Sequence, residues 1–380
     1  LQDKLTGGYD DKTARLSMLW NGESLSVTAL TNTAVIPERR ISVDKTLIDE
    51  TVADMIDPPI EEREQLSTVL SGLLIPRDFR DVLRRGEAVV FEVDREMAKA
   101  HWEMLTCELI GEKRSQPISL LVPVARQLRT TYSPPPSADE AERTPLKALL
   151  IGDPGDGEYQ LPGARKEAFE VKKILEGCGV EVTALIGADY PQRKLEQWRA
   201  GDEALKGIAP ASRRHVLGLL MREQFDILHY CGHGSFDPTN ADRSGWLFED
   251  GKLLSSRELE QIDHVPRLVV ANACLSGRVA EARAMGSINP ELALLPSLAD
   301  EFFRRGVRNY LGTAWEIDDA GAIVFAQMLY QTLLGEGATL GEAILAARLA
   351  LQPHEQSFGV LWAAYQHYGD PRFTLNVSSK

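Results

Sequence analysis

Two stretches of the chain, Phe225–Gly234 (FDILHYCGHG) and Leu268–Gly277 (LVVANACLSG), decide the fold. Each begins with a short, almost continuous apolar run, Phe225–Tyr230 in the first and Leu268–Ala271 in the second, which is typical of a strand buried on both faces of a parallel sheet. In each stretch the run leads directly into a chemically reactive side chain, His233 in the first and Cys274 in the second. Because ligand sites in parallel sheets lie beyond the carboxyl ends of the strands, we expect His233 and Cys274 to meet at one edge of the sheet.

Apolar runs and helical patterns alternate through the rest of the C-terminal half. Further strands are expected at Ala148–Ile151, Val180–Leu185 and Val307–Thr313, and helices at Arg165–Glu176, Val216–Glu223, Leu298–Arg305, Ala320–Leu333 and Leu340–Leu351. Strands that alternate with helices in this way form parallel βα units. The sequence therefore predicts an α/β fold with a mostly parallel central sheet.

A proline-rich stretch, residues 133–145 (SPPPSADEAERTP), divides the chain. Consecutive prolines donate no backbone hydrogen bonds, so neither a helix nor a central strand continues through them. We interpret this stretch as a linker between an N-terminal half, residues 1–132, and a C-terminal half, residues 146–380. In the N-terminal half, two alternating segments joined by Asn21-Gly22 predict a hairpin. No motif there carries chemistry, and we expect a smaller, non-catalytic α/β half.

The composition excludes several classes of protein. The 42 basic and 56 acidic side chains give a net charge of −14, which argues against broad binding to a nucleic-acid backbone. Four cysteines are too few for a disulfide scaffold, and neither a membrane span nor a signal peptide is evident. We therefore expect a cytoplasmic protein without membrane contact. The chain starts with Leu1 rather than Met, so we expect a processed form or a piece of a longer polypeptide.

Histidine and cysteine at neighbouring strand ends can form a nucleophilic pair. The imidazole of His233 can lower the pKa of a nearby Cys274 thiol and so activate its sulfur. His229 lies within the apolar run and is expected to be a core histidine. The remaining cysteines are expected to be small buried hydrophobes: Cys107, Cys178 and Cys231. A redox pair of Cys231 with Cys274 is the alternative for these two thiols.

Five motifs together resemble the CHAT domain, a bacterial branch of the caspase-like cysteine peptidases. They are LPGARKEAFEVKKIL (161–175), HYCGHG (229–234), LVVANACLSG (268–277), GVRNYLGTAWEIDD (306–319) and YGDP (368–371). Their order and spacing match the family over residues 146–375. The N-terminal half is similar to the non-catalytic first half of longer CHAT proteases through LLIPRDFRDVLRRGEAVVFEVD (73–94) and HWEMLTCELI (101–110).

The resemblance implies a caspase-like, three-layer α/β/α fold in which His233 and Cys274 form a catalytic dyad. His233 would act as general base and acid, and Cys274 as the nucleophile that attacks the scissile carbonyl. The oxyanion donors that the family implies are the backbone N–H groups of Gly234 and Cys274. Neither a cofactor nor a metal ion belongs to this chemistry. The implied activity is that of a cysteine endopeptidase acting on protein substrates.

The resemblance also indicates where the P1 side chain of a substrate would bind. Where caspases carry an arginine that selects aspartate, this chain carries the acidic stretch Thr313–Asp319. Glu316 and Asp318 in that stretch, and Asp153 after the first strand of the C-terminal half, are expected to bind substrate, with Arg or Lys preferred at P1. Two alternatives are open: a neutral P1 residue, and a structural role for Asp318 and Asp319 at the start of the following helix.

The family also implies a context for the activity. CHAT proteases commonly sit beside sensor or repeat domains, so we expect a sensor domain or an activating partner outside this chain, within a bacterial signalling or antiviral-defence assembly. The alternative is a catalytically quiet, caspase-like interaction module, which the presence of both His233 and Cys274 disfavours. Another α/β hydrolase or transferase that uses Cys274 is a third interpretation. The sequence lacks the GxSxG, Walker and dinucleotide-binding motifs of the common rivals.

Overall fold

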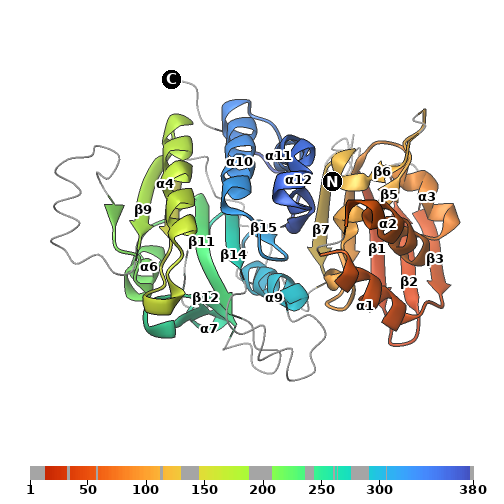
Figure 1. Ribbon diagram of the computed structural model, residues 1–380, viewed down its shortest axis with the longest axis horizontal. Coiled ribbons are helices and arrows are strands. Elements are labelled where there is room, and N and C mark those ends of the chain that lie inside the picture. The colour runs from red at the N-terminus through yellow and green to blue at the C-terminus, as the bar shows by residue number, and fades with distance from the viewer. Residues whose placement is uncertain are drawn as a thin grey trace, which may run out of the picture. The chain divides into compact units, whose positions relative to one another are not determined.

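The computed structural model describes residues 13–31, 35–56, 59–111, 114–129, 145–187, 208–235, 244–259, 262, 264–274, 291–304 and 306–376. The chain divides into two compact units, Leu1–Arg129 and Thr130–Lys380, whose strands and helices are drawn in Figure 1. Most of the expected linker at 133–145 lies outside the described residues.

The five strands described next form the mixed sheet of the first unit, with both parallel and antiparallel pairs. They are β1 (Thr13–Trp20), β2 (Leu25–Leu30), β3 (Val35–Ile41), β4 (Ala88–Val93) and β7 (Val124–Leu128), in the spatial order β7-β4-β1-β2-β3. The pairs β1–β4 and β4–β7 are parallel, whereas β1–β2 and β2–β3 are antiparallel. The predicted hairpin is confirmed. Gly22 takes a left-handed φ of 95°, and the Asn21 side chain accepts from the Ser24 N–H at 2.8 Å.

The described part of the first unit also contains three α-helices, a second small sheet and a buried ion pair. The remaining elements are α1 (Lys45–Asp54), α2 (Ile60–Leu74) and α3 (Arg77–Leu83), with a small sheet of β5 (Thr106–Cys107) and β6 (Gln116–Pro117). The side chains of Arg126 and Glu103 are fully buried and form an ion pair. Arg126 also donates to the carbonyl oxygens of Ala98 and Ala100, at 2.7 and 2.9 Å. The buried charge of Arg126 is therefore compensated within the unit.

The second unit is built on the mostly parallel sheet that the sequence predicts. In spatial order its strands are β10 (Ile208–Ala209), β9 (Glu181–Ile186), β8 (Lys147–Gly152), β11 (Ile227–Ser235), β14 (Leu268–Cys274), β15 (Asn309–Thr313) and β16 (Tyr365–Tyr368). Neighbours are parallel from β10 to β15, and β16 is antiparallel to β15. A ribbon of β12 (Gly245–Leu247) and β13 (Leu253–Ser255) pairs with the end of β11. The predicted fold class is confirmed.

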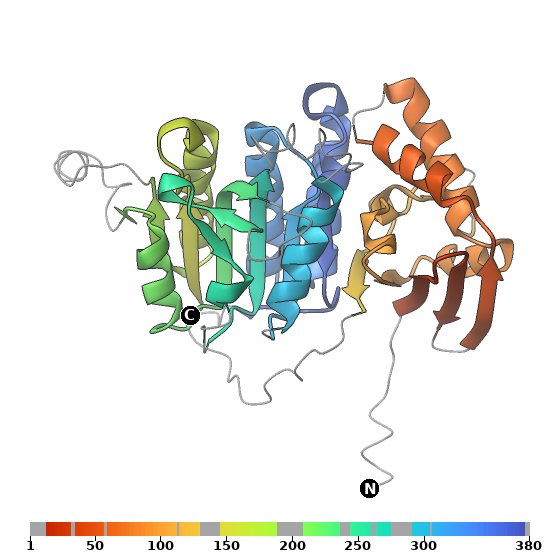
Figure 2. The same cartoon turned by 90° about the horizontal axis from the view of Figure 1, so that it is seen from below.

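Helices cover both faces of this sheet, as Figure 2 shows. One face carries α4 (Pro162–Gly177), α10 (Asp319–Tyr330) and α11 (Leu340–Leu351), and the other α6 (Arg213–Leu220), α7 (Ser256–Leu259) and α9 (Glu291–Arg304). The short helices α12 (Glu355–Phe358) and α13 (Leu361–Ala364) follow α11. Within the described part of the chain, none of the helices has the length and apolar character of a membrane span.

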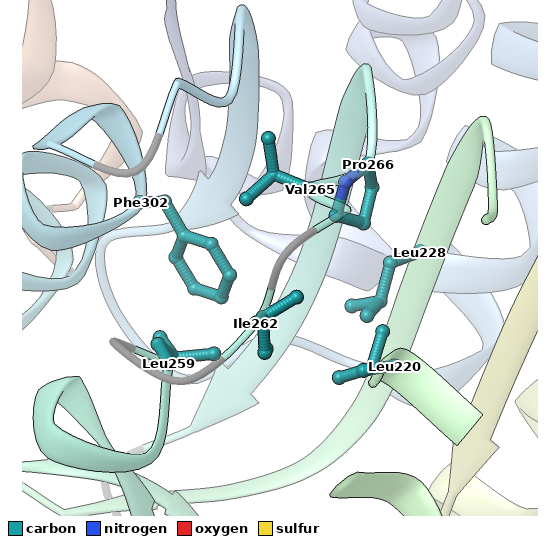
Figure 3. Close-up of a pocket in the computed structure, with 7 residues that line it drawn as sticks. All are labelled: Leu220, Leu228, Leu259, Ile262, Val265, Pro266 and Phe302. Carbon is teal, nitrogen blue, oxygen red and sulfur yellow. The ribbon is translucent and has the colours of Figure 1, made fainter. Parts of the chain in front are cut away.

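Alternate residues of β11 face the two helical layers. His229 lies 2.7 Å from the hydroxyl of Tyr330 on α10, whereas Leu228 lies among side chains from α6, α7 and α9. A small apolar void remains on that second side (Figure 3), lined by Leu220, Leu228, Leu259, Ile262, Val265, Pro266 and Phe302. Because this lining offers no polar group to a ligand or to water, we interpret the void as a packing defect.

Both decisive strands extend farther than the sequence predicts. His233 belongs to β11 and Cys274 is the last residue of β14, so neither lies in the loop after its strand. The two strands stay paired to this point, and β12 adds pairs to the end of β11. An apolar pattern marks which side chains are buried, whereas a strand continues for as long as its backbone finds a partner. This explains why the pattern ended early at Tyr230 and Ala271.

Candidate active site

The parallel register of β11 and β14 places His233 opposite Cys274. The register begins at Ile227 paired with Leu268 and continues without a shift to His233 paired with Cys274. Neighbouring strands of a sheet lie about 4.8 Å apart, so the backbones of the two residues are adjacent. The sequence predicted that the two would meet at one edge of the sheet, and the register brings them together there.

The imidazole of His233 is held in a buried environment. Its side chain is buried, and the ring of Tyr159 stands edge-on to it with the ring centroids 6.4 Å apart. Burial lowers the pKa of His233 below its usual 6.5, and the nearby Asp153 carboxylate works in the opposite direction. A neutral imidazole is the form that can accept a thiol proton, so this environment suits a general base.

Tyr230 holds the backbone of His233 through a hydrogen bond. The Tyr230 hydroxyl donates to the His233 carbonyl oxygen at 2.7 Å, and its ring stacks on Trp246 of β12 with the centroids 4.4 Å apart. Burial raises the pKa of Tyr230 well above its usual value, so the hydroxyl keeps its proton. Gly232 makes this arrangement possible, since a Cβ there would lie 2.6 Å from the Tyr230 hydroxyl oxygen and 3.0 Å from Pro154.

Asp153 lies at the end of β8 in an unusual conformation. It is buried, its φ of 47° falls in the left-handed region, and its N–H donates to the Cys231 carbonyl oxygen at 2.8 Å. Its carboxylate accepts from the Leu161 N–H at 2.7 Å and from the Arg165 guanidinium at 2.8 Å. This carboxylate therefore has a cationic partner within the chain, while its charge is still felt at His233.

A family comparison decides the class of the protein. The model of the CHAT domain matches residues 63–370, which is most of the chain. The chain belongs to the CHAT domain family. The match begins inside the first unit, ahead of the stretch 146–375 on which the resemblance was based. No curated protein gives a significant match.

Three solved structures are similar to this CHAT chain, and the TM-score of the first supports a shared fold. Separase of Saccharomyces cerevisiae, in its complex with securin, has a TM-score of 0.53 at 9% identity; the match covers 95% of this chain and 30% of the separase chain. The Arg-specific cysteine proteinase gingipain R has a TM-score of 0.45 at 12% identity, over 87% of this chain and 74% of that chain. The pro- and mature domains of RgpB from Porphyromonas gingivalis give 0.46 at 10%, over 87% and 77%. Membership of the CHAT domain family supports the predicted cysteine-type peptidase.

Two of the predicted substrate residues, Glu316 and Asp318, lie between β15 and α10 of the CHAT chain. Asp318 is the N-cap of α10, where its carboxylate accepts from the N–H groups of Ala320 and Gly321 at 2.9 and 3.0 Å. This is the structural role that the sequence left open for Asp318. Glu316 is exposed to solvent in the same loop. Substrate binding by Asp153, Glu316 and Asp318 stays a prediction.

Asp319 is a neighbour of the site that the sequence analysis did not single out for substrate binding. A Cβ at Gly163, in the first turn of α4, would clash with the Asp319 carboxylate, so the two residues are in close contact. Burial raises the pKa of Asp319, and Glu167, Asp318 and Glu316 raise it further by repulsion. The signal in the sequence was the run of acidic residues itself, but its contact with α4 joins segments far apart along the chain.

The backbone positions expected to form the oxyanion hole lie in the same two strands. Gly234 follows His233 in β11 and pairs with Trp246 of β12, and Cys274 ends β14. Their assignment as donors stays a prediction.

A cluster of possible metal ligands lies close to the two strand ends, on the α4 side of the sheet. Within the described residues, Glu167, His229 and Cys231 offer ligand atoms that all lie within 4.8 Å of one another.

Proposed function

We propose that the chain is a cysteine endopeptidase in which Cys274 is the nucleophile and His233 the general base. The observation that carries the proposal is the unbroken parallel register that pairs the two residues at the ends of β11 and β14. The burial that lowers the pKa of His233 supports the role of a base, because it keeps the imidazole neutral and ready to take a proton. Membership of the CHAT family supports the reaction class.

The proposed reaction has two halves. The Cys274 thiol gives its proton to His233, and the thiolate attacks the scissile carbonyl carbon. The N–H groups of Gly234 and Cys274 stabilise the oxyanion, each contributing about 3 kcal/mol. The imidazolium then protonates the leaving amine as the peptide C–N bond breaks, which leaves the acyl group on Cys274 as a thioester. Water, deprotonated by the same imidazole, attacks this thioester, and the proton returns to the Cys274 sulfur as the C–S bond breaks. Asp153 supports the transient imidazolium through its negative charge.

The proposed preference at P1 is for Arg or Lys. Its support is a crowding of carboxylates around Asp319: burial raises the pKa of Asp319, and repulsion from Glu167 on α4 and from Asp318 and Glu316 raises it further. A cationic substrate side chain would relieve this repulsion, whereas an aspartate would add to it. Glu316 is an exposed carboxylate of the loop between β15 and α10, where a substrate side chain can reach it. Asp153, already bound by Arg165, contributes its charge at longer range.

A panel of fluorogenic peptides that differ only at P1 tests both parts of the proposal. The wild type and Cys274→Ala are compared on peptides ending in Arg, Lys, Leu, Met and Asp. We expect cleavage by the wild type alone, strongest after Arg or Lys. Strong cleavage after a neutral residue would keep the peptidase and overturn the P1 preference. Equal cleavage by Cys274→Ala would overturn the role of Cys274.

We also propose that a sensor domain or partner outside this chain activates the peptidase, within a bacterial signalling or defence assembly. This part of the proposal rests on the family resemblance. It predicts that the isolated chain turns over peptides slowly. Addition of the partner should raise kcat/KM for the same peptide without changing the P1 preference. The catalytically quiet module predicts instead that Cys274→Ala and wild type behave alike under every condition.

A further inference from the structure

A buried group of three metal-ligating side chains lies below the proposed dyad. Glu167 projects from α4, and His229 and Cys231 stand two residues apart on β11, so both face the same side of the sheet. The side chains are 3%, 0% and 0% exposed. Their ligand atoms all lie within 4.8 Å of one another. A carboxylate, an imidazole and a thiol therefore converge on one point in the core.

The charge balance at this point is incomplete. Within the described part of the chain, the Glu167 carboxylate accepts from the Asn272 amide and lies 3.5 Å from His229 Nε2. No lysine or arginine of the described part of the chain forms an ion pair with it. Buried carboxylates are normally paired with a charge or coordinate a metal. A cation at this point would neutralise Glu167.

Two buried polar atoms, one in the cluster and one beside it, also point to a ligand here. His229 Nε2 and Asn272 Oδ1 are both buried and have no hydrogen-bond partner. The other ring nitrogen of His229, Nδ1, lies 2.7 Å from the Tyr330 hydroxyl. With the proton on Nδ1 and donated to Tyr330, Nε2 presents its lone pair to the cluster. Metal-binding histidines are commonly oriented by such a hydrogen bond from the second ring nitrogen.

We propose that Glu167, His229 and Cys231 form a structural zinc site. A thiolate, a neutral imidazole and a carboxylate are the donor types that Zn²⁺ takes, and their summed charge of −2 matches the ion. Cys231 binds as the thiolate and releases its proton to solvent, and Asn272 Oδ1 or a water completes the tetrahedron. Zinc bonds of about 2.0–2.3 Å require the ligand atoms to close in by about 1 Å.

The consequence of the site is a clamp on the two strands that carry the dyad. The ion would join α4 to β11 two residues before His233. Through the hydrogen bond from Asn272 to Glu167 it would also hold β14 two residues before Cys274. The site lies outside the peptidase reaction and does not depend on it.

Metal binding is tested in a Cys274→Ala background, so that the proposed dyad cannot contribute a thiolate. After equilibration with buffered Zn²⁺ and removal of the excess, we expect about one zinc per chain by mass spectrometry of the metal. Replacement by Co²⁺ should give the visible bands of a tetrahedral site and a near-ultraviolet band from a cobalt–thiolate bond. Both signals should vanish in Cys231→Ser and persist in Cys107→Ser, whose thiol belongs to β5 of the first unit.

A second variant separates ligation from folding. Tyr330→Phe removes the hydroxyl that orients His229 but none of the proposed ligands, and should weaken zinc binding by about 10–100-fold. Its folded state is checked by circular dichroism. A chain that takes up much less than one zinc, or a cobalt–thiolate band that survives in Cys231→Ser, would overturn the proposal. Should Cys231→Ser fail to fold, Glu167→Gln serves in its place, together with the metal content of the parent chain.

Discussion

The two units of the chain both contain parallel strand pairs, but they treat the polar groups at the strand ends differently. In the first unit, Asp94 directly follows β4, and its carboxylate accepts from the backbone N–H groups of Trp20 and Met97. The buried Arg126 of β7 is likewise neutralised by Glu103. The charges of Asp94 and Arg126 are thus satisfied by neighbours in the same unit, which stabilises the fold.

In the second unit, the corresponding edge holds His233 and Cys274 side by side. Asp153 lies nearby with its charge shared between Arg165 and the imidazole. The same edge of a parallel sheet can therefore stabilise the fold or hold reactive groups, depending on which residues follow its strands. Substitutions at the two edges should therefore have different consequences.

The largest effect is expected from the proposed dyad. Cys274→Ala and His233→Ala should each lower kcat/KM by about 10⁴-fold or more, because the nucleophile or its base is lost. Cys178→Ala, matched in chemistry but outside the site, should keep full activity. The assay uses the best peptide of the P1 panel, with circular dichroism to check the fold. More than a tenth of the wild-type activity in Cys274→Ala would contradict the assignment.

The next largest effect is expected on the stability of the first unit, at the buried ion pair of Arg126 with Glu103. Arg126→Met leaves the Glu103 carboxylate buried without its cation and should lower the free energy of unfolding by about 3–5 kcal/mol. Unfolding in urea measures this loss. The double variant with Glu103→Gln should recover part of it, since no unpaired charge then remains. A loss below about 1 kcal/mol for Arg126→Met would show that the pair is not needed.

The pH profile of peptide cleavage should report the buried state of His233. Burial lowers the pKa of His233 below 6.5, so the imidazole stays neutral, and active as a base, to a lower pH than an ordinary histidine. As pH falls through this pKa, kcat/KM should drop by about tenfold per pH unit. An acid limb at or above pH 6.5 would contradict the buried environment of this histidine.

Asp153 should tune that limb. Asp153→Asn removes a negative charge that raises the pKa of His233 and leaves the charge of Arg165 unbalanced. The acid limb should therefore move to lower pH, and kcat/KM should fall by about tenfold because the imidazolium of the transition state loses support. Glu316→Gln, which changes an exposed carboxylate, is the matched control and should leave the limb in place. An unchanged limb in Asp153→Asn would remove Asp153 from the electrostatics of the site.

The smallest effect is expected in the apolar void of the second unit. Val265→Ile adds one methylene to its lining and should raise the free energy of unfolding by up to about 0.8 kcal/mol. The same substitution at Val35, which is 73% exposed, should change nothing. Thermal unfolding measures both. A loss of stability in Val265→Ile would show that the void cannot accept the added carbon.

The sequence predicted the sheet because buried parallel strands leave a clear apolar signature, as in the runs before His233 and Cys274. It also predicted the Asn21-Gly22 hairpin, since few residues adopt a positive φ. The strand ends were placed too early, because glycines and polar residues in Gly232–Ser235 hide a backbone ladder that continues.

Contacts between distant segments account for what the sequence analysis missed. The ion pair of Asp153 with Arg165 and the contact of Asp319 with Gly163 depend on packing between segments. The buried group around Glu167 is a further example, because α4 and β11 come together only in the fold. Residue types and spacing alone do not encode these distances.

The most direct test is the rate of alkylation of Cys274 by iodoacetamide, resolved by peptide mapping, in the wild type and in His233→Ala. Burial raises the pKa of both Cys107 and Cys178, which makes these thiols slow internal references. If His233 activates Cys274, then Cys274 reacts much faster than either reference in the wild type and slows markedly in His233→Ala. Alkylation of Cys274 at the same rate in both proteins, no faster than Cys178, would contradict the proposed dyad.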